Sequence, residues 1–135
     1  MGAWGTSPFE DDGSLDFLQL INEAPSEDIL DEAFNNVFEN EEDYIDTDVC
    51  SSALMAGEII ATVNGKPSSK YNGQMEFDFE SLKNQISNDL IEKGIKAINI
   101  VKSSEKSELK ELWEEADFEE WLVEVESLIE RLKSI

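Results

Sequence analysis

The sequence predicts an all-α fold, a compact single-domain bundle of about five or six helices with an extended N-terminal lead-in. Apolar residues recur at intervals of three and four over several long segments, which places them on one face of an α-helix. Capping and turn residues separate these segments, as helix ends require. With 135 residues, 40% of them hydrophobic, residues 1–135 have the material for one core rather than two.

Residues 1–13 are expected to form the extended lead-in. Glycines and Pro8 occur there without a helical period of apolar residues, and both residue types favour turns or extended backbone. Trp4 and Phe9 are large apolar side chains of this stretch, and we expect them to anchor it to the core.

Two amphipathic helices are predicted next. The first begins after Ser14, because a serine hydroxyl can accept a hydrogen bond from a backbone N–H at a helix start. The second opens at Pro25-Ser26. Its apolar residues fall in adjacent pairs every four positions, namely Ile29, Leu30, Ala33, Phe34, Val37 and Phe38.

The third helix is expected to lie at the centre of the bundle. Residues 39–48 are the densest acidic stretch, and they should form a loop that ends at a cap on Asp46 or Thr47. From Val49 to Val63 apolar residues occupy more than one face, which is typical of a buried helix. Small residues would let neighbouring backbones approach it closely, namely Ala53, Ala56, Gly57 and Ala61.

Residues 64–78 are the predicted main internal linker. Asn64 and Gly65 tolerate the positive φ of a helix end, and Pro67 prevents the helix from continuing. From Met75 to Phe79 apolar and acidic residues alternate, as they do in a strand. No partner strand is evident nearby, so the strand is the weaker alternative.

The C-terminal half predicts three helices. A long one runs from Phe79 to Val101, with a bend or close contact at Gly94 because glycine weakens a helix interior. A short one lies around Leu109–Trp113.

The last helix begins at Asp117, which has the spacing of a capping box to Glu120. Two heptads are too few for a coiled coil, which favours packing into the same core. Its apolar positions are Phe118, Trp121, Leu122, Val125, Leu128, Ile129 and Leu132.

Charge is unevenly distributed along the chain. The formal net charge is −22, and every Lys and Arg lies at or after Lys66, so residues 1–65 carry −16 and the remainder −6. Such a field repels nucleic acid and anionic lipid and favours basic partners, although acidity also serves solubility alone. The predicted partner-binding residues are Glu39, Glu41, Glu42, Asp43, Asp46 and Asp48.

The sequence contains no histidine, which removes the commonest general base near neutral pH, Ser-His and Cys-His nucleophile pairs and most zinc sites. It contains no phosphate-binding glycine loop followed by lysine, and residues 39–48 lack the glycine and terminal glutamate of a calcium loop. We therefore predict no enzyme activity, no catalytic residue, no metal site and no cofactor. Carboxylate-only catalysis, or binding of Ca²⁺ or Mg²⁺, is the alternative.

Two single residues inside apolar surroundings are candidates for chemistry. Cys50 lies among apolar neighbours without a cation in sequence to lower its pKa, so we expect a buried structural thiol. Glu58 lies between Gly57 and Ile59. On a helical projection it shares a face with Ser51, Met55 and Thr62, and we expect it to point toward water.

The N-terminal residues carry a family resemblance. Met1-Gly2-Ala3-Trp4-Gly5, Phe9-Glu10-Asp11-Asp12 and Leu15-Asp16-Phe17-Leu18 together resemble the opening of the bacterial domain of unknown function 4259. The similarity continues through Ala53–Ile60 and the Leu112-Trp113-Glu114-Glu115 and Trp121-Leu122 segments. Phe17 stands where a Trp is usual and Ser7 where a Gly is usual. The resemblance implies a bacterial cytoplasmic helical domain and transfers no catalytic residue.

The leading hypothesis for function is an acidic protein-binding domain that docks on a basic partner. Its concrete forms are an immunity-type inhibitor of a toxin such as a nuclease, or a nucleic-acid mimic whose carboxylates replace phosphates. A third class is an assembly subunit with an exposed apolar patch around Trp113, Trp121 or Phe77. Apolar runs are too short for a membrane helix and the N-terminus lacks a signal-peptide pattern, so we expect a cytoplasmic protein with neither a membrane nor a nucleic-acid partner.

Overall fold

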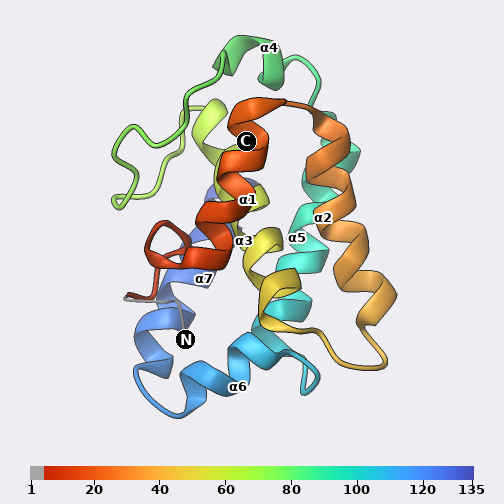
Figure 1. The fold of residues 1–135 in the computed structure, drawn as a ribbon, viewed down its shortest axis with the longest axis vertical. Helices are drawn as coiled ribbons and strands as arrows, with labels where there is room; N and C mark the ends of the chain where they lie inside the picture. The colour runs from red at the N-terminus through yellow and green to blue at the C-terminus, as the bar shows by residue number, and fades with distance from the viewer. Residues whose placement is uncertain (1–4) are drawn as a thin grey trace.

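The computed structural model of the chain describes residues 5–135, and in that range it confirms the all-α fold (Figure 1). Seven α-helices occur there, six of them seven residues or longer, and no β-strand. The elements are η1 Pro8–Glu10, α1 Asp12–Glu23, α2 Glu27–Asn40, α3 Thr47–Val63, α4 Phe79–Lys83, α5 Asn88–Ser103, α6 Glu108–Glu114 and α7 Phe118–Lys133. None of the helices in residues 5–135 combines the length and apolarity needed to cross a membrane.

Helix α3 is the centre of the molecule, as its apolar pattern predicts. It contacts α1, α2, α5 and α7. From Ala53 to Val63 every residue is buried. Gly57 permits a close approach, because a Cβ there would lie 2.6 Å from Ile98 Cδ1 of α5 and 3.1 Å from Leu128 Cδ2 of α7. The small residues of α3 therefore allow two helices to pack directly against its backbone.

Within the described part of the chain the predicted extended lead-in is wrong over Pro8–Glu10, which form the short 3-10 helix η1, and α1 starts at Asp12, earlier than predicted. Asp11, rather than Ser14, is the N-cap of α1, because its Oδ1 accepts hydrogen bonds from Gly13 N at 2.8 Å and Ser14 N at 3.2 Å. Ser14 is buried and donates to the carbonyl of Ser51 in α3 at 3.1 Å. Phe9 is buried, as predicted, whereas Trp4 lies outside the described residues.

Side-chain caps fix the starts of α2 and α3 where the sequence predicts them. Ser26 accepts a hydrogen bond from Asp28 N at 3.1 Å. Asp46 accepts one from Val49 N at 3.0 Å and is the N-cap of α3. These caps satisfy backbone N–H groups that have no partner within the first helical turn.

The predicted single helix from Phe79 to Val101 is wrong, because the chain breaks between α4 and α5. Asp78 caps α4 through Glu80 N at 3.0 Å, and Ser87 caps a new helix through Leu90 N at 3.1 Å. A close contact at Gly94 is confirmed, since a Cβ there would lie 2.8 Å from the ring of Phe34.

Residues 64–78 carry neither helix nor strand, as expected of the linker, and the alternative of a strand over Met75–Phe79 is wrong. Asn22 of α1 binds this backbone in place of a partner strand. Its Nδ2 donates to Gln74 O at 3.1 Å, and its Oδ1 accepts from Glu76 N at 2.8 Å. Met75, between them in sequence, is buried.

Helix α7 packs its apolar face into the common core, as predicted, with Trp121, Val125, Leu128, Ile129 and Leu132 buried. The predicted capping box at its start is wrong. Asp117 has a left-handed backbone with φ of 60°, and its side chain makes no capping hydrogen bond. The turn between α6 and α7 needs this conformation, which aspartate adopts more readily than most residues.

Candidate functional site

The fold brings a second acidic segment beside residues 39–48. Ile45 N donates to Lys106 O at 2.9 Å, and Glu108 N donates to Ile45 O at 2.9 Å, in an isolated parallel bridge between Ile45 and Ser107. Thr47 N donates to the Glu108 carboxylate at 2.8 Å. Residues 39–48 and 104–120 therefore occupy one end of the molecule, opposite α4 (Figure 1), and we call them the acidic end.

The acidic end holds fourteen carboxylates against two lysines, Lys106 and Lys110. The six predicted residues Glu39, Glu41, Glu42, Asp43, Asp46 and Asp48 are all exposed. Eight further acids join them from residues 104–120: Glu105, Glu108, Glu111, Glu114, Glu115, Asp117, Glu119 and Glu120, exposed except for the half-buried Glu108. Sequence reasoning missed this second half, because the two segments are adjacent only in the fold.

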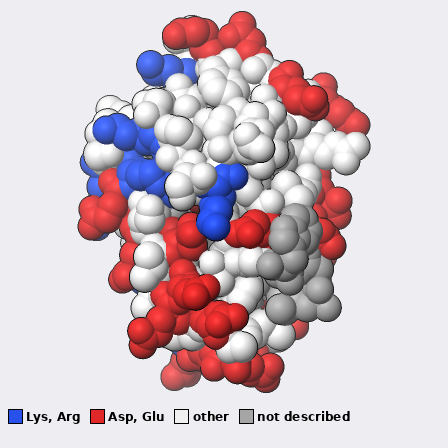
Figure 2. All heavy atoms as spheres, turned by 90° about the vertical axis from the view of Figure 1, so that its left-hand side faces the viewer, with Lys and Arg blue, Asp and Glu red and all other residues white. Residues whose placement is uncertain are grey.

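Charge is also segregated in space. On the face shown in Figure 2, cationic side chains lie in the upper half, while the lower half carries carboxylates without them. Lys110 is partly neutralised, since its Nζ lies 3.6 Å from Glu114 on the same helix. Carboxylates therefore dominate the field at this end, and their negative potential attracts a cationic group on approach.

Tyr44 is an exposed aromatic residue inside the acidic end, with 47% of its surface accessible. Desolvation, together with the nearby carboxylates of Glu108 and Glu111, raises the pKa of its phenol to about 12. Tyr44 is therefore a neutral aromatic side chain among carboxylates at physiological pH. Tyrosine is also among the residue types that most often anchor protein interfaces.

A hollow of about 340 Å³ lies where the starts of α1, α3 and α6 meet. Its lining residues are Asp11, Asp12, Gly13, Asp16, Thr47, Asp48, Ser51, Glu108, Leu109 and Leu112. Asp11 and Glu108 are engaged internally, Asp11 with the Ser51 hydroxyl at 3.0 Å and Glu108 with Thr47 N. Asp12, Asp16 and Asp48 are exposed. We call this hollow the α1–α3–α6 groove.

Among residues 5–135 no three carboxylate or thiol side chains are grouped so that they could hold a metal ion. Cys50 is a buried thiol, as expected, with Sγ 3.5 Å from both Ile45 O and the Ser107 hydroxyl. Burial raises the pKa of the Cys50 thiol above its ordinary value, and the Ser107 hydrogen bond offsets this only in part. Since the thiolate is the reactive form, this thiol is structural.

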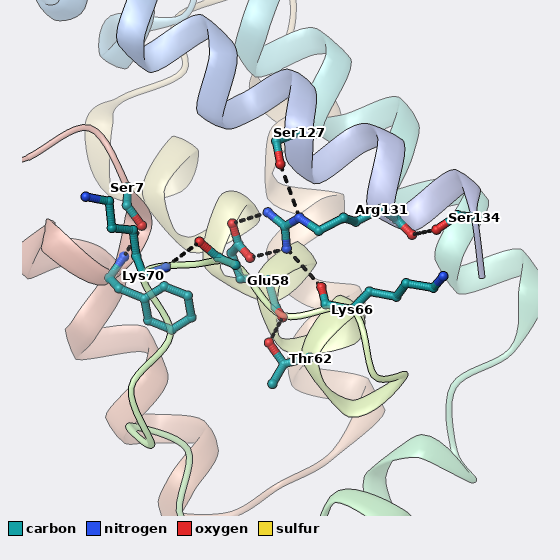
Figure 3. Close-up of polar contacts among 10 residues, drawn as sticks. Ser7, Glu58, Thr62, Lys66, Lys70, Ser127, Arg131 and Ser134 are labelled. Atoms are coloured by element: carbon teal, nitrogen blue, oxygen red, sulfur yellow. Dashed lines mark hydrogen bonds and ion pairs between the residues drawn. The ribbon is translucent and has the colours of Figure 1, made fainter.

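The prediction that Glu58 points to water is wrong. Its side chain is buried under α7 and pairs with Arg131 in a two-pronged ion pair, Nη1 to Oε1 at 2.8 Å and Nη2 to Oε2 at 3.0 Å (Figure 3). Arg131 also donates to Lys66 O at 3.1 Å and to the Ser127 hydroxyl at 3.3 Å. Burial raises the pKa of the Glu58 carboxyl, and Arg131 opposes that shift. The arrangement ties α7 to α3 and to the start of the linker.

The apolar patch predicted around Trp113, Trp121 or Phe77 is also wrong for the tryptophans. Trp113 is 7% exposed and Trp121 is 1% exposed, so both belong to the core. Phe77 is partly buried against the core and its ring centroid lies 5.5 Å from that of Phe79. The two tryptophans therefore provide no exposed apolar patch for assembly.

Comparison with known families supports the resemblance in the N-terminal residues. The family model of a domain of unknown function (DUF4259) matches residues 2–124. The chain belongs to this family. The match covers the acidic end and the α1–α3–α6 groove but not Arg131. Neither a curated protein nor a solved structure matches the chain.

Proposed function

We propose that this DUF4259 chain is a binding protein whose acidic end docks on a basic protein partner. One observation supports the proposal most directly: two segments distant in sequence join to place fourteen carboxylates and only two lysines at one end of the molecule. Such a surface accelerates association with a basic partner and repels acidic ones. Tyr44 supplies an aromatic contact within it.

The concrete form that we favour is an immunity-type inhibitor of a basic toxin, such as a nuclease. The groove that such an enzyme uses for nucleic acid is lined with cations for phosphate. Exposed carboxylates on a rigid helical end can occupy it in place of the phosphates. The partner would then lose access to its substrate while the inhibitor is bound.

The test is capture of the partner from its native extract by the immobilised protein, at about 0.05 M and then about 0.5 M salt, where screening differs strongly. The test variant changes Glu41, Glu42 and Asp43 to Lys. A matched control changes Glu23, Glu76 and Glu80 to Lys, with the same charge change on exposed residues near the α4 end. We expect the protein to retain its partner at low salt and release it at high salt.

The test variant should lose the partner at both salt concentrations, while the control should keep it at low salt. Loss in both variants to the same degree would mean that net charge, and not the acidic end, governs binding. Unchanged capture by the test variant would remove the acidic end from the binding surface.

A further inference from the structure

The α1–α3–α6 groove combines an apolar floor with an acidic rim. Leu109 and Leu112 of α6 provide apolar floor, and Leu109 is 3% exposed. The rim carries Asp12 and Asp16 from α1 and Asp48 from α3, all exposed. The hollow of about 340 Å³ lies at the lower end of the volumes typical of ligand pockets.

Hydrogen bonds tie together the three helices that line the groove. Asp11 of the α1 cap accepts from the Ser51 hydroxyl of α3 at 3.0 Å, and Thr47 N of α3 donates to Glu108 of α6 at 2.8 Å. Asp48 Oδ1 lies 3.3 Å from the position that a Cβ on Gly13 would take, so this carboxylate lies beside the start of α1. The groove is therefore a fixed feature rather than a gap between independent segments.

Amphipathic cations complement this combination of surfaces. Lysine and arginine carry an aliphatic stem that packs on apolar surface and a charged head that stays with polar groups. In the groove the stem would lie on Leu109 and Leu112, and the head would reach the carboxylates of Asp16 and Asp48. A small inorganic cation would leave the apolar floor uncovered, and an apolar side chain would leave the rim without a counter-charge.

We infer that the α1–α3–α6 groove receives one lysine or arginine side chain of the basic partner. This inference rests on the proposed function, and it specifies where one basic residue of the partner binds. The groove lies at the edge of the acidic end and shares five residues with it, Thr47, Asp48, Glu108, Leu109 and Leu112. A partner docked on the acidic end would thus insert a basic side chain at its edge. This contact fixes the orientation of the partner, which charge attraction alone does not.

The experiment uses the full chain and two small cations of equal charge. The labelled protein is titrated with n-butylammonium, which reproduces the lysine stem and head, and separately with methylammonium, which has no stem. The readout is the NMR shift of the Leu109 and Leu112 methyl groups at constant ionic strength of about 0.15 M, where screening confines charge effects to about 8 Å. We expect saturable shifts with n-butylammonium and none with methylammonium.

The test variant is Asp16→Asn with Asp48→Asn, and the control is Glu76→Gln with Glu80→Gln, which removes the same charge from exposed positions outside both the groove and the acidic end. The test variant should bind n-butylammonium about three- to tenfold more weakly, as expected for two exposed ion pairs. The control should change the affinity less than about twofold. Thermal melting of both variants establishes that they are folded.

Equal shifts with the two cations, or equal weakening in the two variants, would overturn the inference, as would the absence of saturable shifts. The titration needs no partner protein. Its failure would leave the docking proposal standing, and failure of the capture experiment would leave the groove standing as a cation site.

Discussion

Removing Arg131 tests whether the buried ion pair holds α7 to α3. The perturbation is Arg131→Met, which keeps an unbranched side chain over Glu58 but removes the charge. The Glu58 side chain is 1% exposed, so its carboxylate would be left without a counter-ion in a site that water does not reach. Breaking a buried pair on one side costs about 3–5 kcal/mol, a large part of the roughly 5–15 kcal/mol that stabilises a typical domain.

The destabilisation caused by Arg131→Met should depend on pH. The pKa of Glu58 is raised by burial and lowered by Arg131, so removal of the arginine raises it further. A carboxyl with a raised folded pKa contributes stability below its unfolded pKa of about 4.3 and loses it as pH rises through the folded value. The destabilisation by Arg131→Met should therefore be smaller at pH 5 than at pH 7, because protonation of Glu58 relieves the unpaired charge.

The assay is urea unfolding followed by circular dichroism at pH 7 and pH 5, with wild type measured beside each variant. Comparison with wild type at each pH cancels the response of the many surface carboxylates. The double variant Glu58→Met with Arg131→Met replaces the pair by apolar side chains and should recover most of the lost stability. A loss of less than about 1 kcal/mol in the free energy of unfolding for Arg131→Met would contradict the reasoning, as would a loss that is the same at both pH values. Either result would show that Arg131 does not compensate the burial of the Glu58 carboxylate.

Two further predictions concern the core and a helix start. Trp121→Ala should lower the free energy of unfolding by about 3–5 kcal/mol, because removal of a ring that is 1% exposed leaves a cavity. A melting temperature within about 2 °C of that of wild type would contradict the position of Trp121 in the core. Asp46→Ala should cost about 1 kcal/mol through loss of the cap on Val49 N, whereas Asp43→Ala, equally acidic and exposed, should cost less than about 0.5 kcal/mol. Equal effects of the two in chemical denaturation would assign the change to charge rather than capping.

Much of the fold follows from the sequence because apolar periodicity and caps act locally. The pairs of apolar residues in α2, the crowded apolar faces of α3 and the Asp46 cap are each confirmed. Apolar periodicity does not predict the break between α4 and α5, because Leu82, Ile86 and Leu90 continue a helical period across it. There the Ser87 cap outweighs the periodicity.

The sequence wrongly predicts that Glu58 points toward water for a different physical reason. A helical projection assumes that one face meets water, but α7 covers the face of α3 that carries Glu58. The charge of Arg131, 73 positions further along the chain, makes that burial possible. Half of the acidic end is likewise missed by sequence reasoning, because residues 104–120 meet residues 39–48 through tertiary contacts, the bridge between Ile45 and Ser107 and the bond from Thr47 N to Glu108.

The position of Arg131 has a practical consequence for work on the family. The family match ends at residue 124, whereas the guanidinium that neutralises Glu58 and the apolar residues Leu128, Ile129 and Leu132 lie after it. A recombinant fragment trimmed to the matched residues would retain the acid inside α3 and discard its counter-ion. Boundaries for expression or for grafting this domain should therefore extend at least through Lys133, the last residue of α7.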